Sequence, residues 1–174
     1  MRPAQSILAL AIAVAVLRGS LACNRAPADN GFSLPTPTGF VKREPTQPHV
    51  VLVLHHEAAA AKVTDMLIVT AVPLQHPDRP PTIEAEIDSD KRVLTKNHPE
   101  AAYGPVETIV VDGADGRLFW VTYQLKEKAV RSHRMLVFHD SKVYMALFTT
   151  DQSRGEEADE QFKSILATWK WSKN

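Results

Sequence analysis

The feature that most constrains the fold is a pair of hairpin patterns in the second half of the chain. Each pattern consists of two strand-like stretches on either side of a short run of turn residues, "DGADG" in the first pattern and "HDS" in the second. The four strand-like stretches are residues 106–111, 116–125, 129–138 and 142–150. Two successive hairpins predict four antiparallel strands in one sheet.

A helix pattern follows these hairpins in "GEEADEQFKSILATWKW", residues 155–171. Four residues recur at helical spacing and would form one apolar stripe: Ala158, Phe162, Ile165 and Trp169. Acidic residues gather in the first turns, and Lys170 lies near the end, which suits the helix dipole. The stretch therefore predicts an amphipathic helix that covers the sheet.

The first half of the domain has the same mixed character. Residues 49–57 and 62–74 are rich in Val, Ile and Leu and predict two further strands. The opening "GFSLPTPTGF", residues 31–40, predicts an irregular edge strand interrupted by prolines. With the second half, this order predicts a single α+β domain over residues 31–174.

Residues 81–97 fit both helical and strand periodicity, and we favour a helix. The stretch contains four alternating carboxylates, which would line one face of a strand or spread round the exposed side of a helix: Glu84, Glu86, Asp88 and Asp90. It lacks the glycine turn and the terminal Glu of an EF-hand loop. The Asp-Gly pair at 112–113 is interpreted as a hairpin turn, with Asp115 in the same loop, and not as a calcium site.

The N-terminal segment predicts export. Residues 1–22 have a basic start, an apolar run from 7 to 17 and a small-residue end, which is the layout of a secretory signal peptide. The apolar run spans about 16 Å as a helix and is too short for a permanent membrane span. Cleavage is expected between Ala22 and Cys23, and residues 23–30 are interpreted as a tether.

The tetrad "SLAC" that ends at Cys23 resembles a bacterial lipobox, although Ser20 stands where Leu is usual. The resemblance implies that Cys23 becomes a diacylated, N-acylated residue, which would anchor the protein to a bacterial membrane at its periplasmic face. Lipidation would also use the chain's single thiol. The alternative is a plain secreted protein with one free cysteine.

Charge argues against a nucleic-acid partner. The whole chain is formally neutral, and without the first 22 residues it has 18 basic and 20 acidic residues. A surface of this balance has no broad basic patch. The glycines of "GADGR" lack the spacing of a phosphate-binding loop, so no cofactor is expected.

The order of elements resembles the PsbP-like family, on the stretches "FSLPTPTGF", "VDGADGRLFWVTY", "KVYMALFTT" and "FKSILATWKW". The resemblance covers residues 31–174 and implies an αβα sandwich with a mostly antiparallel sheet. Members of this family are largely non-catalytic and serve as assembly or accessory factors. The family has no shared catalytic signature, so the resemblance assigns no functional residue.

The seven histidines are the first place to look for a metal site. His55 and His56 are adjacent on a predicted strand, so they point to opposite faces and cannot chelate one ion. A site assembled across loops could use His76, Asp78 and His98, although their spacing matches no metal motif.

No serine lies in a G-x-S-x-G motif, and Cys23 is outside the domain. Trp171 lies beside Lys170 and is expected either to pack over a sheet edge or to contact a partner. The resulting prediction is a cell-envelope lipoprotein with a non-catalytic binding or accessory role and an unidentified protein partner. The alternatives are a small-ligand or metal-binding periplasmic domain and, third, a hydrolase.

Overall fold

The computed structural model describes residues 30–57 and 65–172. The predicted signal peptide, Cys23 and the tether as far as residue 29 lie outside the described residues, so their assignment stays a prediction. In the described ranges, no helix is both long enough and apolar enough to cross a membrane.

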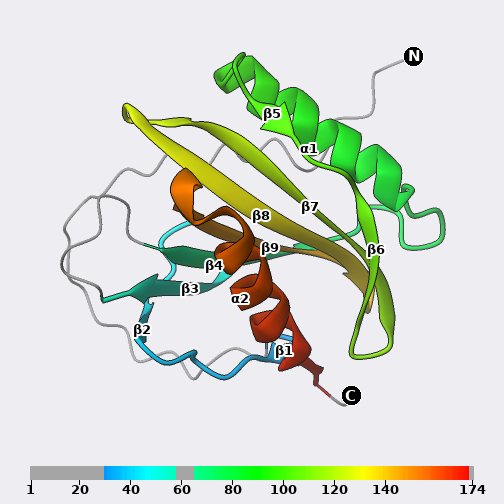
Figure 1. The fold of residues 1–174 in the computed structure, drawn as a ribbon. Coiled ribbons are helices and arrows are strands. Elements are labelled where there is room, and N and C mark those ends of the chain that lie inside the picture. Colours follow the sequence, from blue (N-terminus) through cyan, green and yellow to red (C-terminus); the bar gives the residue numbers. More distant parts are fainter. Residues whose placement is uncertain (1–29, 58–64, 173–174) are drawn as a thin grey trace.

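An eight-stranded antiparallel sheet forms the middle layer of the domain (Figure 1). Its order is β2-β3-β4-β9-β8-β7-β5, and β6 also pairs with β7. The strands are β2 (Phe40–Arg43), β3 (Val50–His56), β4 (Met66–Pro73), β5 (Ala102–Tyr103), β6 (Glu107–Val111), β7 (Ala114–Leu125), β8 (Lys128–His139) and β9 (Lys142–Asp151). Helix α1 (Ile83–Asn97) covers one face and α2 (Gly155–Ala167) covers the other, which confirms the predicted αβα sandwich.

Tight turns set the register of the long strands. The β6–β7 turn consists of Asp112 and Gly113, whose φ angles of 46° and 86° are those of a type I′ hairpin turn. The β7–β8 and β8–β9 connections also consist of two residues with positive φ. The predicted five-residue loop is therefore shorter, and Asp115 belongs to β7, opposite Val110.

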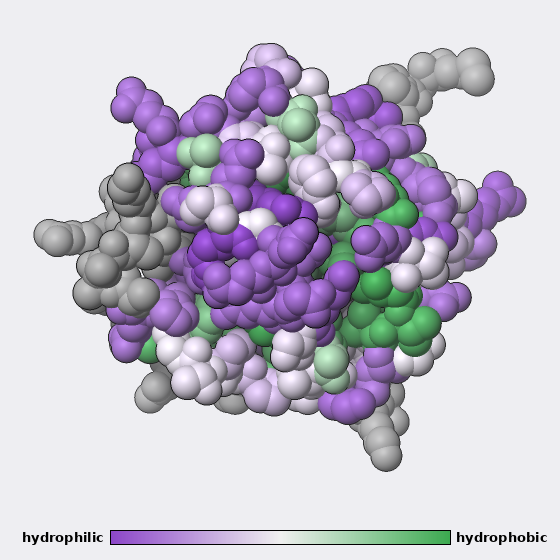
Figure 2. Space-filling model, in the orientation of Figure 1, coloured by the Kyte–Doolittle hydropathy of each residue, from purple (hydrophilic) through white to green (hydrophobic). Residues whose placement is uncertain are grey.

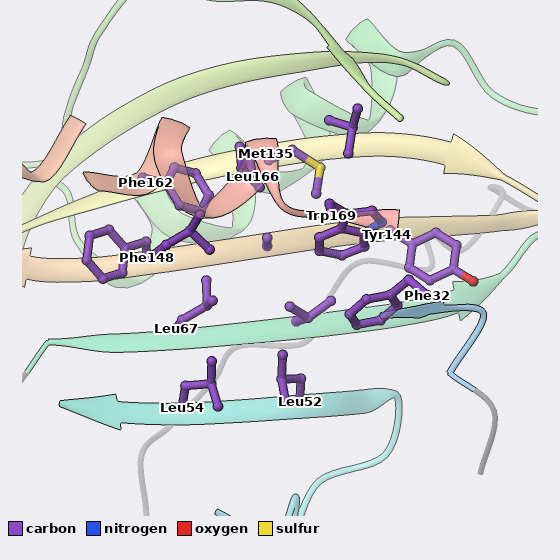
Figure 3. Packing of buried hydrophobic residues seen from close by; sticks show 14 of the residues in the cluster. Phe32, Leu52, Leu54, Leu67, Met135, Tyr144, Phe148, Phe162, Leu166 and Trp169 are labelled. Carbon is purple, nitrogen blue, oxygen red and sulfur yellow. The ribbon is translucent and has the colours of Figure 1, made fainter. Parts of the chain in front are cut away.

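The larger core lies between the sheet and α2 (Figure 3). Most of the alternate residues of β4, β8 and β9 that face α2 are apolar, as period-2 patterning requires, and β8 adds Arg131 and His133, which face Asp159 of α2. Two stacked pairs of aromatic rings attach α2 and the two terminal segments of the domain to these strands. Phe148 stacks on Phe162 with centroids 5.7 Å apart, and Phe32 stacks on Trp169 at 4.1 Å.

Helix α1 resolves the ambiguity over residues 81–97 in favour of a helix. Two prolines precede it, and the Oγ1 atom of Thr82 accepts a hydrogen bond of 3.1 Å from the N–H of Ala85. At the other end, the N–H of His98 donates to the carbonyl of Leu94 at 2.7 Å. Both ends are therefore capped by local residues.

The second helix is shorter than predicted. It ends at Ala167, and Lys170–Trp171 form β10, which pairs with β1 (Phe32–Ser33) in a separate two-stranded sheet. The physical reason is a long-range contact, because the carboxylate of Asp112 accepts from Lys170 Nζ at 2.7 Å and from the Trp171 N–H at 2.9 Å. The opening stretch is correspondingly split, with β1 outside the main sheet and β2 at its edge.

Candidate functional site

The loop residues considered for a metal site are not brought together. His76 and Asp78 precede α1, whereas His98 caps its far end, and a helix of 15 residues is about 22 Å long. Figure 1 shows the loop before α1 and strand β5 at opposite ends of this helix. Among the described residues, no group of three or more His, Cys, Asp or Glu side chains is arranged to hold a metal ion.

His133 is the most buried histidine of the described chain, with its side chain 1% exposed. Its Nδ1 atom lies 2.9 Å from Oδ1 of Asp159, but without hydrogen-bond geometry, and neither ring nitrogen has a hydrogen-bond partner. Burial lowers the pKa of His133, and the nearby Asp159 carboxylate opposes that shift. The rings of Phe148 and Phe162 flank it, so this histidine is part of the core under α2.

A second buried polar group lies under α1. Glu86 and Asp90 are both 8% exposed, and the Asp90 carboxylate pairs with the guanidinium of Arg134 on β8. This differs from the expected exposed row of carboxylates, because only part of the row faces solvent. Glu84 points outward, where it pairs with Arg117 at 2.8 Å.

Glu86 has no such partner. Its Oε2 atom is buried and makes no hydrogen bond, and burial raises the pKa of its carboxyl group. Nearby in the same layer, Thr149 donates to Ser132 at 3.2 Å. The layer under α1 therefore contains two paired sets, Asp90 with Arg134 and Ser132 with Thr149, and one buried carboxylate oxygen without a partner, that of Glu86.

Trp171 lies half-buried at the end of the larger core. Its indole N–H donates to the Val111 carbonyl at 2.9 Å, and its ring stacks on His139 with centroids 4.0 Å apart. The hydrogen bond from Lys170 to Asp112 is the main reason why the pKa of that carboxyl is lowered. Trp171 thus ties the C-terminal strand to the β6–β7 hairpin, while contact with a partner stays a prediction.

The open edge of the main sheet is the remaining candidate. We use "β6 edge" for the outer side of β6 together with Val106, Thr108 and Val110. Val111 and Ala114 flank the two-residue turn and form a hydrogen-bonded pair. In an antiparallel ladder, hydrogen-bonded pairs alternate with pairs that exchange no hydrogen bond. Thr108 and Val110 belong to the second kind, so their peptide groups point away from β7. No described backbone group pairs with them on that side.

The side chains of the β6 edge are exposed as well. Val106 is 42% and Val110 is 67% exposed, and they are the two exposed large hydrophobic residues of the described chain. Figure 2 views the face that carries α2 and shows a hydrophobic area over the β6–β7 hairpin. Val106 and Val110 themselves belong to the α1 side of the strand, because Ile109 and Val111 pack against the core under α2. Exposed apolar side chains beside unpaired peptide groups are the features that recruit an additional strand.

The other edge of the sheet is formed differently. Strand β2 ends in Lys42 and Arg43, both exposed, and prolines precede it in the sequence. Charged residues and prolines are the usual means by which an edge strand avoids pairing with another chain. The β6 strand, "ETIVV", has one charge at its start and no lysine or proline.

Solved structures resemble this fold. Cyanobacterial PsbP from Synechocystis sp. PCC 6803 has a TM-score of 0.66 at 12% identity, with 88% of this chain and 98% of that chain covered. The domain has a PsbP-like fold. LpqN of Mycobacterium tuberculosis, described as involved in cell envelope biogenesis, has a TM-score of 0.58 at 10% identity, with 82% and 83% covered. A Pseudomonas aeruginosa protein of unknown function has a TM-score of 0.58 at 11% identity, with 70% and 83% covered.

No protein-family model matches the chain, and no curated protein matches its sequence. At identities of 10–12%, these neighbours establish the fold and carry over no site. The site must therefore be argued from the PsbP-like domain itself. Of its polar groups, those around His133 and Arg134 lie inside, whereas the β6 edge has groups that are exposed and unpaired. Sequence analysis identified β6 as a strand but not as an open edge, because strand order is not encoded locally.

Proposed function

We propose that this chain is an exported lipoprotein whose PsbP-like domain is a non-catalytic binding or assembly module of the cell envelope. The N-terminal pattern that ends in "SLAC" supports export and lipid anchoring through Cys23. The structural likeness to LpqN, a protein involved in cell envelope biogenesis, is consistent with that location. The anchor would hold the domain close to the membrane and to other envelope proteins.

The observation that carries the binding role is the β6 edge. Strand addition to a sheet edge uses main-chain hydrogen bonds for affinity and alternate side chains for specificity. Thr108 and Val110 offer the peptide groups, and the exposed Val106 and Val110 offer apolar contacts. We expect a protein partner that contributes an extended segment along this edge.

The buried histidine supports a binding role over a hydrolytic one. In a hydrolase, a base and a nucleophile lie within hydrogen-bond reach of each other in an accessible pocket. The His133 side chain is only 1% exposed, and its Nδ1 atom lies 2.9 Å from the Asp159 carboxylate inside the core, so the pair is closed to a substrate. The small-ligand or metal alternative has less support, because His76 and His98 lie at opposite ends of α1.

The test begins with the mass of the mature protein extracted gently from its own host's membranes. We expect a chain that begins at Cys23 and carries acyl groups. A bare chain in the soluble fraction would contradict the anchor.

The binding role is tested by co-isolation from the same membranes. Thr108→Lys places a charge on the β6 edge and should reduce the co-isolated partner at least tenfold. Lys42→Ala, on the opposite edge of the sheet, is the matched control and should change nothing. Equal recovery of the same chains with both variants would refute a binding role for β6.

A further inference from the structure

We infer that the strand which pairs with the β6 edge is β6 of a second copy of this chain. The inference rests on the proposed function and names its partner. The two strands would run antiparallel about a two-fold axis at Thr108. The two sheets would then join into one continuous sheet across the dimer.

The register follows from the positions of the exposed residues. Thr108 is two residues from Val106 and two residues from Val110, and residues at a spacing of two share one face of a strand. In an antiparallel pair centred on Thr108, Val106 of each copy lies opposite Val110 of the other. The two Thr108 side chains lie opposite each other between these valine pairs. β-Branched and Thr–Thr pairs of this kind stabilise antiparallel strands.

The backbone fits the same register. The peptide groups of Thr108 point away from β7, so the two copies of Thr108 would exchange both hydrogen bonds. Val110 offers its outward peptide groups in the same way. A self-complementary edge of this kind forms a closed dimer and does not extend further, because pairing consumes the β6 edge of both copies. The charged β2 strands at the far ends of the joined sheet would oppose further addition.

The charge of Glu107 is compatible with this symmetric pairing and gives it a measurable signature. On the opposite face, Glu107 of one copy lies opposite Ile109 of the other, so no two carboxylates are directly opposed. The two Glu107 side chains are diagonal neighbours, and the Nζ atom of Lys163 lies 3.9 Å from Glu107 in each copy. The residual repulsion between them should weaken the dimer. Removal of this charge should therefore strengthen dimerisation.

Cysteine cross-linking at the proposed two-fold axis tests whether a second copy pairs with the β6 edge. The experiment uses the exported chain with Cys23→Ser, so that the introduced cysteine carries the only thiol. Directly opposite residues have Cα atoms about 5.5 Å apart in a hydrogen-bonded pair, a spacing that permits a disulfide. Thr108→Cys should oxidise to a covalent dimer. Lys42→Cys, exposed on the other edge strand, is the control and should stay monomeric.

Sedimentation velocity of the chain without introduced cysteines gives a second, independent readout. Val110→Lys should weaken self-association at least tenfold, and Glu107→Gln should strengthen it. Circular dichroism and the melting temperature of each variant establish that the fold is kept. Sedimentation as a monomer up to about 1 mM, together with no faster cross-linking of Thr108→Cys than of Lys42→Cys, would overturn the inference.

The two proposals fail separately. If the chain is monomeric and Thr108→Lys still removes a different protein from the membrane extract, the second-copy inference is wrong and the binding role of β6 stands. If neither self-association nor co-isolation responds to Thr108→Lys, both are wrong.

Discussion

Helix α1 should depend for its attachment on one buried ion pair, and this dependence can be measured. Most side chains that α1 buries are polar: Glu86, Ser89 and Asp90, beside a single apolar residue, Ile87. Asp90 and Arg134 have side chains only 12% and 5% exposed. The Nε atom of Arg134 has no hydrogen-bond partner, so the guanidinium depends strongly on the Asp90 carboxylate.

Asp90→Ala removes the carboxylate and leaves the guanidinium buried without its counter-charge. Breaking a buried pair in this way costs about 3–5 kcal/mol. This is a large fraction of the roughly 5–15 kcal/mol that stabilises a domain. For a chain of this size, it should lower Tm by roughly 6–20 °C.

Replacement of both partners should be much less harmful. Asp90→Ala combined with Arg134→Met removes both charges and keeps an apolar side chain against the sheet. The double variant should recover most of the lost free energy of unfolding, because a buried pair contributes little relative to apolar residues of similar volume.

The assay is urea unfolding followed by circular dichroism, with the four proteins of the double-mutant cycle measured at pH 7. Glu84→Ala is the control, because it breaks an ion pair on the same helix whose carboxylate is 61% exposed. That pair should contribute less than about 1 kcal/mol. A loss below about 1 kcal/mol for Asp90→Ala, or additive losses in the double variant, would refute the reasoning.

Three further predictions use other parts of the domain. Gly104→Ala should destabilise the fold by about 1–3 kcal/mol in urea unfolding, because the added Cβ would lie 2.1 Å from Cε2 of Trp120. An unchanged midpoint would show that Trp120 moves freely. Glu86→Gln should raise the free energy of unfolding at pH 7 by about 1 kcal/mol, since the raised pKa means that the folded state disfavours the carboxylate. This gain should disappear below pH 4.5, where the carboxyl is protonated in both states. Because the pKa of His133 is lowered in the folded state, the unfolded chain binds a proton at this histidine at a higher pH than the folded chain does. The free energy of unfolding should therefore fall as the pH drops below 6.5, the ordinary pKa of histidine. His133→Gln should flatten that part of a pH–Tm curve, and the same slope in the variant would exclude His133 as the cause.

The strands and turns could be predicted because their signals are local. Alternating apolar residues and an Asp-Gly pair specify the β6–β7 hairpin, and the positive φ angles of Asp112 and Gly113 are those expected for it. Helix α1 was also predicted, and its cap at Thr82 comes from neighbouring residues. In these segments the sequence preference and the packing agree.

The features that sequence analysis missed depend on contacts between distant residues. The helical pattern continues to Trp171, but the chain leaves the helix after Ala167 because Asp112 and β1 bind the following residues. The inward direction of Asp90 follows from Arg134, which is 44 residues away. The sequence pattern alone suggests that all the carboxylates of α1 face solvent. Asp90 is buried because the guanidinium of Arg134 supplies a counter-charge inside the domain.

The β6 edge could not be predicted from the sequence either, because whether a strand lies at an edge depends on how the whole sheet is assembled. The residues of β6 alone would suit an internal strand, because all but Glu107 and Thr108 are aliphatic. β6 forms the edge because the next segment folds back as β7, while the preceding β5 pairs further along that same strand. The exposed Val110 follows from that topology, and so does the self-complementary order of side chains about Thr108. The α2 side of the sheet is packed by two stacked aromatic pairs, Phe32 with Trp169 and Phe148 with Phe162. The β6 edge is joined to this core through Ile109 and Val111, while the outward peptide groups of Thr108 and Val110 have no strand partner among the described residues. A binding module requires such a combination of a packed support and unpaired groups.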